Sequence, residues 1–493
     1  MPEPLAIPLR EAKAPLVLAL DLGTSGLRAF LFDAQARPIR SCIAYIDRAV
    51  RTSPAGEASV DADERVRDAG QAIDAVLARA GRRAAEVSVV GVSTFWHSLV
   101  GIDARGRRTT RALTWADTRP RDASAALRAE LDEGSVHRRT GCRLHASYLP
   151  AKLRYLRAAE PDAYGRTVWW GSLGEYLYLR LFGERRAGHG MASAPGLYDP
   201  RRCAWDDALL AHLGLDARAL SPIDDAPHTG LRPAFAGRWP ARARVPWLPA
   251  LGDGACSNVG AGAVRRDVAA LMLGTSGAVR VLFEGDDPPV VPGGWTYRLD
   301  ARRIVAGGAF SNAGNVLTWL RGTFPDIDPG AAARRPIGAH GLTALPLLAG
   351  DRSPTWNDAA RAVVAGIGLG TSADDIVQAM VEGVAARVAR LWEIVDPALP
   401  GIARLVVTGG AALGAPWLMQ LCADAIGRPI AASAAGEGSA RGAAIAALER
   451  LGAIPRLDAI PSPLGRVFRP RAGARERLRA IIDRQRLLEE RLC

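Results

Sequence analysis

Two parts of the chain share the same succession of apolar and polar positions. Residues 16–32 read LVLALDLGTSGLRAFLF and residues 270–283 read ALMLGTSGAVRVLF, so each has an apolar run, the tetrapeptide Gly-Thr-Ser-Gly and a second apolar run. Two apolar runs joined by a short glycine-containing turn predict a β-hairpin. The turns at 23–26 and 274–277 are 251 residues apart in a chain of 493, which predicts two similar halves.

The rest of the chain alternates between helical and strand-like patterns, as is typical of α/β domains. We expect the last helix, which is amphipathic and rich in arginine, to provide packing or a solvated surface. The predicted strands are residues 87–93, 404–408 and 429–433, and the predicted helices are residues 63–80, 416–426, 439–451 and 474–492.

The two Gly-Thr-Ser-Gly turns have the chemistry of a phosphate-binding site. Glycine lets the backbone approach a ligand, several N–H groups can converge on one anion, and threonine and serine add hydroxyl donors. A single turn of this kind is equally well explained as a polar hairpin turn, but its repetition in both halves favours a clamp for a polyphosphate. The predicted phosphate-binding residues are Gly23, Thr24, Ser25, Gly274, Thr275 and Ser276.

Asp21 lies just before the first turn, whereas Met272 has the matching place in the second. A carboxylate beside a phosphate site would repel the anion unless a cation lay between them. We therefore predict that Asp21 organises Mg²⁺, through water. The alternative is a structural carboxylate at the end of a strand.

Aromatic, histidine and aspartate residues follow the predicted strand 87–93. A sugar or polyol needs polar side chains for its hydroxyl groups and an aromatic face for its C–H surface, and ligands bind beyond strand ends in α/β proteins. Each residue alone is more often structural, and Arg119 would then simply pair with Asp117. As a cluster they predict a sugar site, formed by Trp96, His97, Trp115 and Asp117.

Asp253 follows a short apolar segment and precedes residues rich in glycine and alanine. One interpretation is a helix N-cap. The interpretation that we prefer is a carboxylate at the cleft between the halves, which accepts a proton from a substrate hydroxyl as it attacks phosphorus, and which also contacts the sugar.

A strand–glycine–glycine–helix unit follows at residues 404–426. Such a unit lets a flat base and a ribose lie against the backbone, although the same pair of glycines is also found in plain strand-to-helix connections. It predicts adenosine binding by Gly409, Gly410 and Ala411.

Composition narrows the function further. The net charge is +12, but only Lys13 and Lys152 are lysines, and the arginines are scattered without interleaved aromatic residues. We therefore expect no nucleic-acid partner; a positive field would instead attract an anionic substrate such as ATP or a sugar acid. Neither lysine follows a glycine, which excludes a P-loop. At 493 residues, two domains are expected.

Nothing in the sequence indicates a membrane. No apolar stretch reaches the ~18 residues of a transmembrane helix, and the N-terminus does not have the pattern of a signal peptide. We expect a cytoplasmic protein without a membrane partner, and the sequence leaves a homodimer open.

Taken together, these segments resemble the FGGY carbohydrate kinases, a branch of the actin-like ATPase superfamily, and are most similar to its gluconokinases. The resemblance covers residues 16–452. Its most specific segments are LALDLGTSGLRAFLFD, LGDGACSNVGAG, LMLGTSGAVRV, VVTGGAALGAPWLMQLCADAIGRPI and GSARGAAIAAL.

The resemblance implies two actin-like α/β domains, each with a ribonuclease H-like mixed sheet flanked by helices, and an active site in the cleft between them. The implied boundaries are 14–250 for a sugar-binding domain with the first phosphate turn, 251–455 for a nucleotide-binding domain, and 456–493 for a helical tail. Asp253 matches the catalytic base and Asp21 the acid near the metal. The two turns match the phosphate-binding motifs, and Gly409, Gly410 and Ala411 match the adenosine motif.

The implied reaction is phosphoryl transfer from Mg²⁺-ATP to a terminal hydroxyl of a sugar acid, with D-gluconate giving 6-phospho-D-gluconate. The alternatives are a kinase for another polyol or a ketose such as xylulose, and an actin-fold ATPase without a sugar site. Arg119, Arg143 and Arg280 are candidates to pair with a substrate carboxylate.

Overall fold

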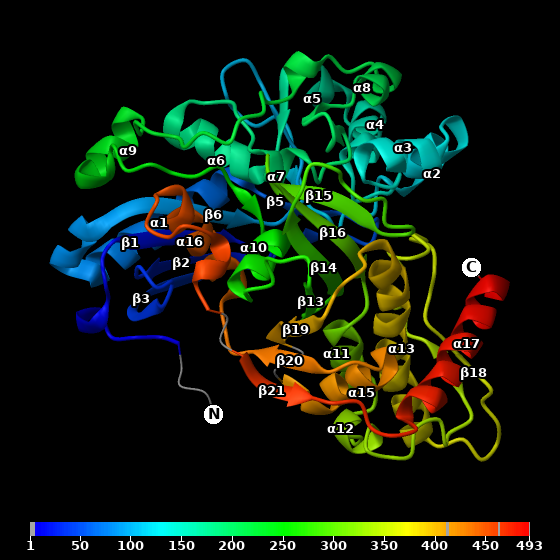
Figure 1. Cartoon of the computed structure of the whole chain (residues 1–493). Coiled ribbons are helices and arrows are strands. Elements are labelled where there is room, and N and C mark those ends of the chain that lie inside the picture. Colours follow the sequence, from blue (N-terminus) through cyan, green and yellow to red (C-terminus); the bar gives the residue numbers. More distant parts are fainter. Residues whose placement is uncertain (1–4, 411–413, 462–463, 493) are drawn as a thin grey trace.

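The first predicted hairpin forms the middle of a five-stranded sheet in the computed structural model, which describes residues 5–410, 414–461 and 464–492 (Figure 1). β1 (Leu16–Leu22) pairs antiparallel with β2 (Gly26–Phe32), and β2 pairs antiparallel with β3 (Pro38–Asp47). On its other side β1 pairs parallel with β6 (Val87–Thr94), and β6 with the short strand β12 (Leu251–Gly252). All residues of β1 are buried, as expected for a strand that is covered on both faces.

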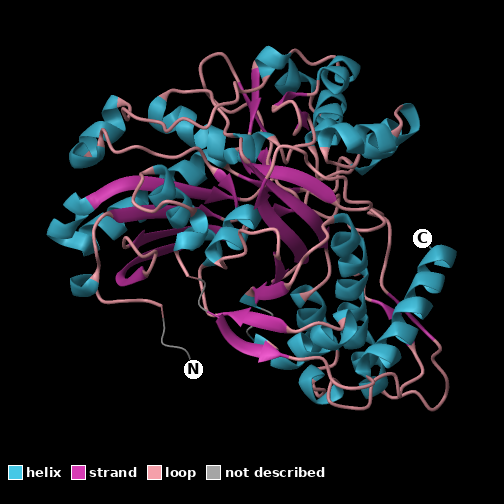
Figure 2. Ribbon diagram, viewed as in Figure 1, coloured by secondary structure: helices cyan, strands magenta, loops and turns pink. Residues whose placement is uncertain are grey.

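The second predicted hairpin has the same place in a seven-stranded sheet. The order β16-β14-β13-β19-β20 repeats the order β3-β2-β1-β6-β12, with the same parallel and antiparallel pairings. β15 and β21 extend the two edges. The prediction of two mixed sheets flanked by helices is confirmed (Figure 2). The strands are β13 (Val268–Leu273), β14 (Gly277–Glu284), β15 (Trp295–Asp300), β16 (Arg303–Phe310), β19 (Arg404–Thr408), β20 (Ile430–Ser433) and β21 (Leu464–Phe468).

Helices cover both sheets, and the four whose ranges were predicted begin and end within one residue of the expected positions. α1 (Ala62–Ala80) packs on β2 and β3, and α13 (Ala373–Ala398) packs on the second sheet. α17 (Ala474–Leu492) packs against α13 and α15 and buries Leu478, Ile481 and Ile482, so one face of it serves packing. The remaining helices around the second sheet are α11 (Gly314–Thr323), α12 (Pro329–Ala332) and α15 (Pro416–Ile426).

Two helices connect the halves of the chain. α10 (Asp253–Gly260) leads from β12 to the second sheet, and α16 (Gly438–Arg450) returns from the second half to pack on β1, β6 and α10. Glycines allow the two helices to approach closely: a β-carbon at Gly442 would overlap the backbone of Cys256, and one at Gly260 would overlap the backbone of Gly438. The division at residues 250 and 251 stays a prediction, but β12 and α16 both lie with the first sheet.

Between β6 and β12 the chain forms a separate group of helices and short strands, drawn in cyan and green at the top of Figure 1. It has its own apolar core, which includes Leu99, Leu127, Leu153 and Trp170. Its helices are α2 (Arg121–Glu130), α3 (Glu133–Thr140), α4 (Leu149–Ala159), α5 (Pro161–Arg166), α6 (Leu173–Phe182), α7 (His189–Ala192), α8 (Asp207–Leu213) and α9 (Pro233–Arg238).

The predicted helical tail is not helical throughout, because β21 within it joins the second sheet beside β20. Short strands complete the description: β4 (Arg51–Thr52), β5 (Ala58–Val60), β7 (Val100–Ile102), β8 (Ala112–Leu113), β9 (Trp169–Gly171), β10 (Tyr198–Asp199), β11 (Ala204–Trp205), β17 (Thr343–Leu345) and β18 (Val363–Ala365).

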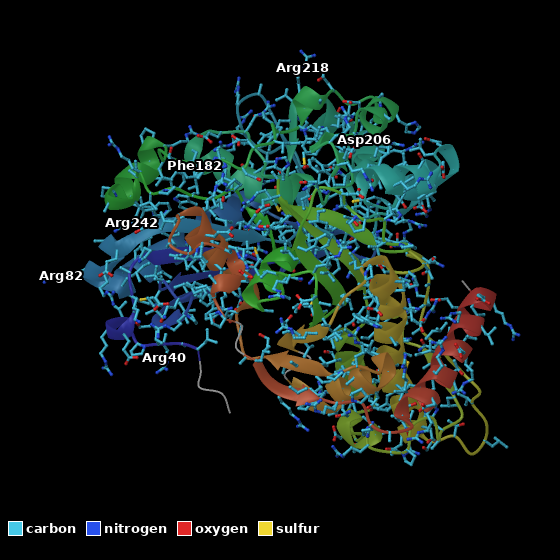
Figure 3. The ribbon with its side chains drawn as sticks, in the orientation of Figure 1. Arg40, Arg82, Phe182, Asp206, Arg218 and Arg242 are labelled. Carbon is cyan, nitrogen blue, oxygen red and sulfur yellow. The ribbon has the colours of Figure 1, made fainter. Side chains whose placement is uncertain are left out.

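Charged side chains are spread over the surface. The exposed residues Arg40, Arg82 and Arg218 lie at separate places on the rim in Figure 3. Within the described ranges, no helix combines the length and the apolar character that crossing a bilayer requires.

Candidate active site

Asp253 is the first residue of α10, directly after β12. Because β12, β6 and β1 are parallel neighbours, their carboxyl ends lie at one edge of the sheet, and this places Asp253 near the residues that follow β6 and β1. Gly252, and not Asp253, has the N-cap position. The Asp253 carboxylate accepts a 2.7 Å hydrogen bond from the Gly254 N–H. The geometry therefore does not support the interpretation as an N-cap.

Burial raises the pKa of Asp253, although the charge of Arg280 and the backbone N–H groups of Gly254 and Trp96 act in the opposite direction. A carboxylate with a raised pKa binds a proton more readily at neutral pH than an ordinary aspartate does. The site therefore favours a proton acceptor at this position.

The Trp96 indole packs directly on the backbone beside Asp253. A β-carbon at Gly252 or at Gly254 would overlap this ring, so glycine at both positions makes the contact possible. The indole Nε1–H donates a 3.0 Å hydrogen bond to the Gly190 carbonyl, which fixes the ring. Trp96 is thus held next to the proposed base.

Asp21 is buried near the end of β1, opposite Ser93 of β6. Burial, aided by the negative charge of Asp253, raises its pKa to about 6, although Ser93 and Arg28 act against this. Arg28 Nη1 lies 3.9 Å from Asp21 and 3.5 Å from Glu437, which precedes α16. Asp21 and Asp253 are therefore near neighbours at the point where the two halves meet.

The residues of the first turn are held by α1 and by the residue that follows β3. Arg65 of α1 donates a 2.8 Å hydrogen bond to the Thr24 carbonyl, and the Arg48 N–H donates a 2.9 Å bond to the Ser25 carbonyl. The turn connects β1 and β2 at the sheet edge that also carries Asp253.

The second turn is held by the beginning of α11. The Gly314 N–H donates a 2.8 Å hydrogen bond to the Gly274 carbonyl, and the Asn315 N–H a 3.1 Å bond to the Thr275 carbonyl. These bonds use the carbonyls of the turn and leave its hydroxyl groups for a ligand.

Gly274, Thr275 and Gly410 line one cavity, together with residues of α11 and the two residues before α15. Gly409 has φ = 104°, and a β-carbon there would overlap the Leu273 carbonyl, so this close approach requires glycine. The structure thus brings the predicted phosphate-binding and adenosine-binding residues of the second half together. Ala411 lies outside the described residues. Completing the lining are Gly314, Leu317, Thr318, Arg321, Gly414 and Ala415.

Trp96 and His97 line a second cavity, whose walls are largely aromatic. His97 has φ = 63°, and its Nδ1 lies 3.0 Å from the Ala194 carbonyl. Because a carbonyl can only accept, Nδ1 carries the proton and Nε2 is left as an acceptor. Burial lowers the pKa of His97 well below its usual value, so the ring is neutral. The other lining residues are Ser147, Tyr148, Arg280, Trp295, Tyr297, Ala309, Arg352 and Trp356.

The buried Lys152 holds His97 in this conformation. Its ammonium group donates hydrogen bonds to the carbonyls of His97 and Thr114, the second at 2.8 Å. Burial lowers the pKa of Lys152 to about 7. No pattern in the sequence connected Lys152 with the site.

Trp115 and Asp117 have different surroundings. The Arg352 guanidinium lies 5.4 Å from the centre of the Trp115 ring, so Trp115 is near the aromatic cavity. Asp117 is buried, and its carboxylate accepts bonds from Arg119 at 2.6 Å and from the Ala58 N–H at 3.2 Å. The structure brings Trp96, His97 and Asp253 together. Asp117 is instead paired with Arg119, which was the structural alternative given for it.

Most of the aromatic wall comes from parts of the chain that the sequence analysis did not connect. Trp295 and Tyr297 stack on each other with ring centres 4.2 Å apart, and Tyr297 bonds to Tyr148 through their hydroxyl groups at 2.6 Å. The alternation Trp-Thr-Tyr in β15 is the one signal that would have placed both rings on one face. Arg352 carried no such signal.

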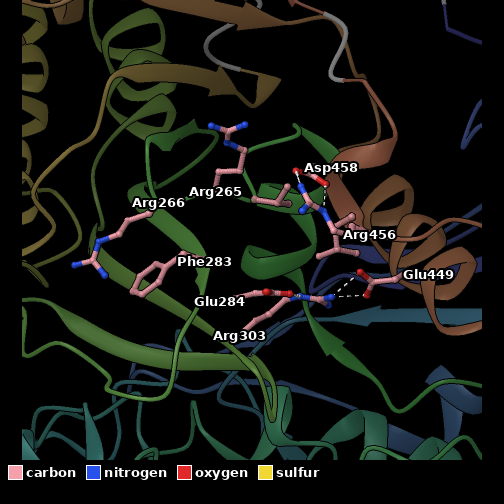
Figure 4. A pocket seen from close by; sticks show the side chains of 10 residues that line it. Arg265, Arg266, Phe283, Glu284, Arg303, Glu449, Arg456 and Asp458 are labelled. Atoms are coloured by element: carbon pink, nitrogen blue, oxygen red, sulfur yellow. Dashed lines mark hydrogen bonds and ion pairs between the residues drawn. The ribbon is translucent and has the colours of Figure 1, made fainter.

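Another cavity lies apart from these, between the ends of β14 and β16 and the segment that follows α16 (Figure 4). Arg303 pairs with Glu449 at 2.6 Å, and Arg456 pairs with Asp458 at 2.5 Å. The first pair connects β16 of the second sheet to α16, and the second lies within the segment that follows α16. None of the predicted site residues lines this cavity.

Both halves of the chain match one known protein family. Residues 16–260 match the FGGY family of carbohydrate kinases, N-terminal domain, and residues 269–449 match its C-terminal domain. A gluconokinase from Bacillus licheniformis is 26% identical over 92% of this chain and 91% of its own. Glycerol kinase 1 from Pseudomonas aeruginosa is 28% identical over 90% of this chain and 92% of its own.

Solved structures show the same fold. A gluconate kinase and a ligand-bound xylulose kinase, both from Lactobacillus acidophilus, each have a TM-score of 0.88 and 21% identity, over 97% of this chain and 98% of theirs. Plasmodium falciparum glycerol kinase with ADP has a TM-score of 0.83 and 18% identity, over 98% of this chain and 99% of its own. With both family domains matched in order along most of its length, the chain belongs to the FGGY family of carbohydrate kinases.

Proposed function

We propose that this kinase transfers the terminal phosphoryl group of ATP to the 6-hydroxyl of D-gluconate, giving 6-phospho-D-gluconate. The observation that carries the proposal is the position of Asp253. The glycines on both sides of it contact the Trp96 ring of the aromatic cavity, its charge acts on Asp21 beside the first turn, and its pKa is raised. A single carboxylate is thus available to both a sugar and a phosphate group.

Asp253 would bind the attacking hydroxyl and accept its proton as the oxygen approaches phosphorus. A general base works best when its pKa lies near the working pH, and burial moves the pKa of Asp253 in that direction. The aromatic rings of the second cavity would contact the C–H faces of the substrate, and His97 Nε2 would accept from a hydroxyl. These contacts would exclude water, the competing acceptor.

The two hairpin turns would bind the phosphates of ATP, with the cavity at Gly274, Thr275 and Gly410 for the nucleotide end. Within the described residues no three His, Cys, Asp or Glu side chains come together as a metal cage. A buried carboxylate at Asp21 fits Mg²⁺, which keeps several waters and takes one or two carboxylates together with substrate phosphates. When bound, Mg²⁺ supplies positive charge to the phosphates.

The Asp253→Asn variant tests the base. Its kcat with gluconate should fall by about 10²–10⁴-fold, because general-base catalysis is lost, while ADP still raises the melting temperature as in the wild type. Asp287→Asn, at a side chain that is 91% exposed, is the control and should keep full activity. Near-normal turnover by Asp253→Asn would remove Asp253 from the mechanism.

A substrate panel tests the sugar. Gluconate, xylulose and glycerol are compared by coupled detection of ADP, and gluconate should have the highest kcat/KM. A preference for xylulose would assign the chain to ketose phosphorylation instead. ADP release that does not respond to any sugar would support the third alternative, an ATPase without a sugar site.

A further inference from the structure

The aromatic cavity contains two arginine side chains with N–H groups that have no partner. Nε and Nη1 of Arg280 and Nε of Arg352 are buried and make no hydrogen bond within the described part of the chain. The known contacts of Arg352 are one 3.3 Å bond from Nη2 to the Phe310 carbonyl and the Trp115 ring. Burying a charged donor without a partner is costly, so such groups are found where a ligand completes them.

The other arginines that the sequence suggested are already paired. Arg119 makes a salt bridge to Asp117 at 2.6 Å, and Arg143 makes one to Glu133 at 2.5 Å. Each of these two guanidinium groups thus has a carboxylate of the protein as its ion-pair partner, and Arg143 leaves only its Nε without a hydrogen bond. Arg280 differs from both of them, because no carboxylate of the described residues makes a salt bridge to it, although the charge of Asp253 acts on it.

Arg280 is close to the proposed base without contacting it. Its guanidinium lies against Gly254, where a β-carbon would be 3.0 Å from Cζ, and its charge lowers the pKa of the Asp253 carboxyl. Burial lowers the pKa of Arg280 itself to about 10, so the group is charged at neutral pH. A small substrate could therefore reach Asp253 with one end and the arginines with the other.

The residues around Arg280 and Arg352 indicate which kind of anion the two arginines bind. The rings of Trp96, Tyr148, Tyr297 and Trp356 line the cavity with the two arginines, as expected for a sugar carbon chain, whereas Gly274 and Thr275 line a different one. We propose that Arg280 and Arg352 bind the carboxylate of an aldonate substrate and thereby select sugar acids over neutral polyols and ketoses. This inference rests on the proposed function, because it assumes that the substrate is a sugar acid.

The test compares D-gluconate with D-glucitol, in which a CH₂OH group replaces the carboxylate. In Arg352→Met and Arg280→Met, kcat/KM for gluconate should fall about 10- to 100-fold, the effect of losing hydrogen bonds to a charged group. The KM for ATP should not change, and kcat/KM should fall less for glucitol than for gluconate, because an altered pKa of Asp253 affects both substrates whereas a lost carboxylate contact affects gluconate alone. Arg352→Lys keeps the charge and should recover part of the loss.

Arg143→Met is the matched control, since it removes an arginine that is paired outside the cavity, and it should leave gluconate kinetics unchanged. Melting temperatures separate a binding role from a structural one. Removing an unpaired buried charge should leave the melting temperature of the free variants unchanged or raise it, while the rise on adding gluconate should shrink.

Three results would overturn the inference: equal losses for gluconate and glucitol, a higher KM for ATP in both methionine variants, or unchanged gluconate kinetics. A different result, obtained with the wild type alone, would reject the proposed function: xylulose or glycerol would be a better substrate than gluconate. If the methionine variants do not fold, the ratio of gluconate to glucitol activity is compared between Arg352→Lys and the wild type. An equal ratio in the two proteins would reject the inference.

Discussion

Replacing Asp21 by asparagine should stabilise the protein at neutral pH while it weakens catalysis. Burial and the negative charge of Asp253 raise the pKa of Asp21 from 3.8 to about 6. This shift of about two pH units corresponds to about 3 kcal/mol, because one unit is about 1.4 kcal/mol. The folded state bears this cost whenever the carboxylate is charged.

The sign of the pH dependence follows from the raised pKa. The folded state binds this proton more tightly than the unfolded state does. The contribution of Asp21 to stability is therefore greatest below pH 3.8, falls as the pH rises to about 6, and then levels off. Asparagine is neutral at every pH and does not show this loss. The melting temperature of Asp21→Asn should therefore match the wild type near pH 4 and exceed it above pH 6, by roughly 6–12 °C if one lobe unfolds as a unit.

Scanning calorimetry from pH 4 to pH 8, without Mg²⁺, measures this difference. Asp63→Asn is a control of opposite sign: although burial acts to raise the pKa of Asp63, hydrogen bonds from Tyr176 and Arg108 lower it below its usual value. That variant should be less stable than the wild type at pH 8, and the difference should shrink as the pH falls. A melting temperature of Asp21→Asn that is lower than the wild type at pH 8, or a difference that does not depend on pH, would refute the reasoning.

Two further variants test how the site is held. Gly252→Ala places a β-carbon in the Trp96 indole, so it should lower the stability by about 1–3 kcal/mol and lower gluconate turnover. This loss of stability should largely vanish when Trp96 is replaced by alanine. The control is Gly165→Ala, where the added carbon meets nothing within 4 Å, and it should melt at or above the wild-type temperature. Lys152→Met leaves the buried His97 carbonyl without its donor, and leaves the Thr114 carbonyl with only the Asp117 N–H. KM for gluconate should therefore rise about tenfold at unchanged KM for ATP; equal effects on both substrates in steady-state assays would contradict the role given to Lys152.

The parts of the fold that sequence predicted well are those with local signals. The two Gly-Thr-Ser-Gly turns and their flanking apolar runs form hairpins because turn chemistry and β-propensity act over a few residues. The strand β12 had no such signal, since it is two residues long and exists only because β6 offers it an edge. Its importance comes from Asp253, the next residue of the chain.

The site was predictable where function depends on a motif and not where it depends on tertiary contacts. Trp96 and His97 were recognised because they follow a buried strand. The pairing of Asp117 with Arg119, two residues further on, was an alternative that the sequence itself offered. Nothing local distinguishes Arg280, whose Nε and Nη1 make no hydrogen bond within the described residues, from the other arginines. That distinction requires knowing every neighbour, and the neighbours of Arg280 come from distant segments of the chain.

The glycine-rich contact between α10 and α16 has a consequence for motion. The two backbones approach each other directly at Gly442 and Cys256, and small sliding between packed helices is one of the ways in which domains close on a ligand. Asp253 begins α10, so any such displacement moves the base itself relative to the second turn. The same movement would then enclose the substrate and align the base. A bulkier residue at Gly442 would oppose both.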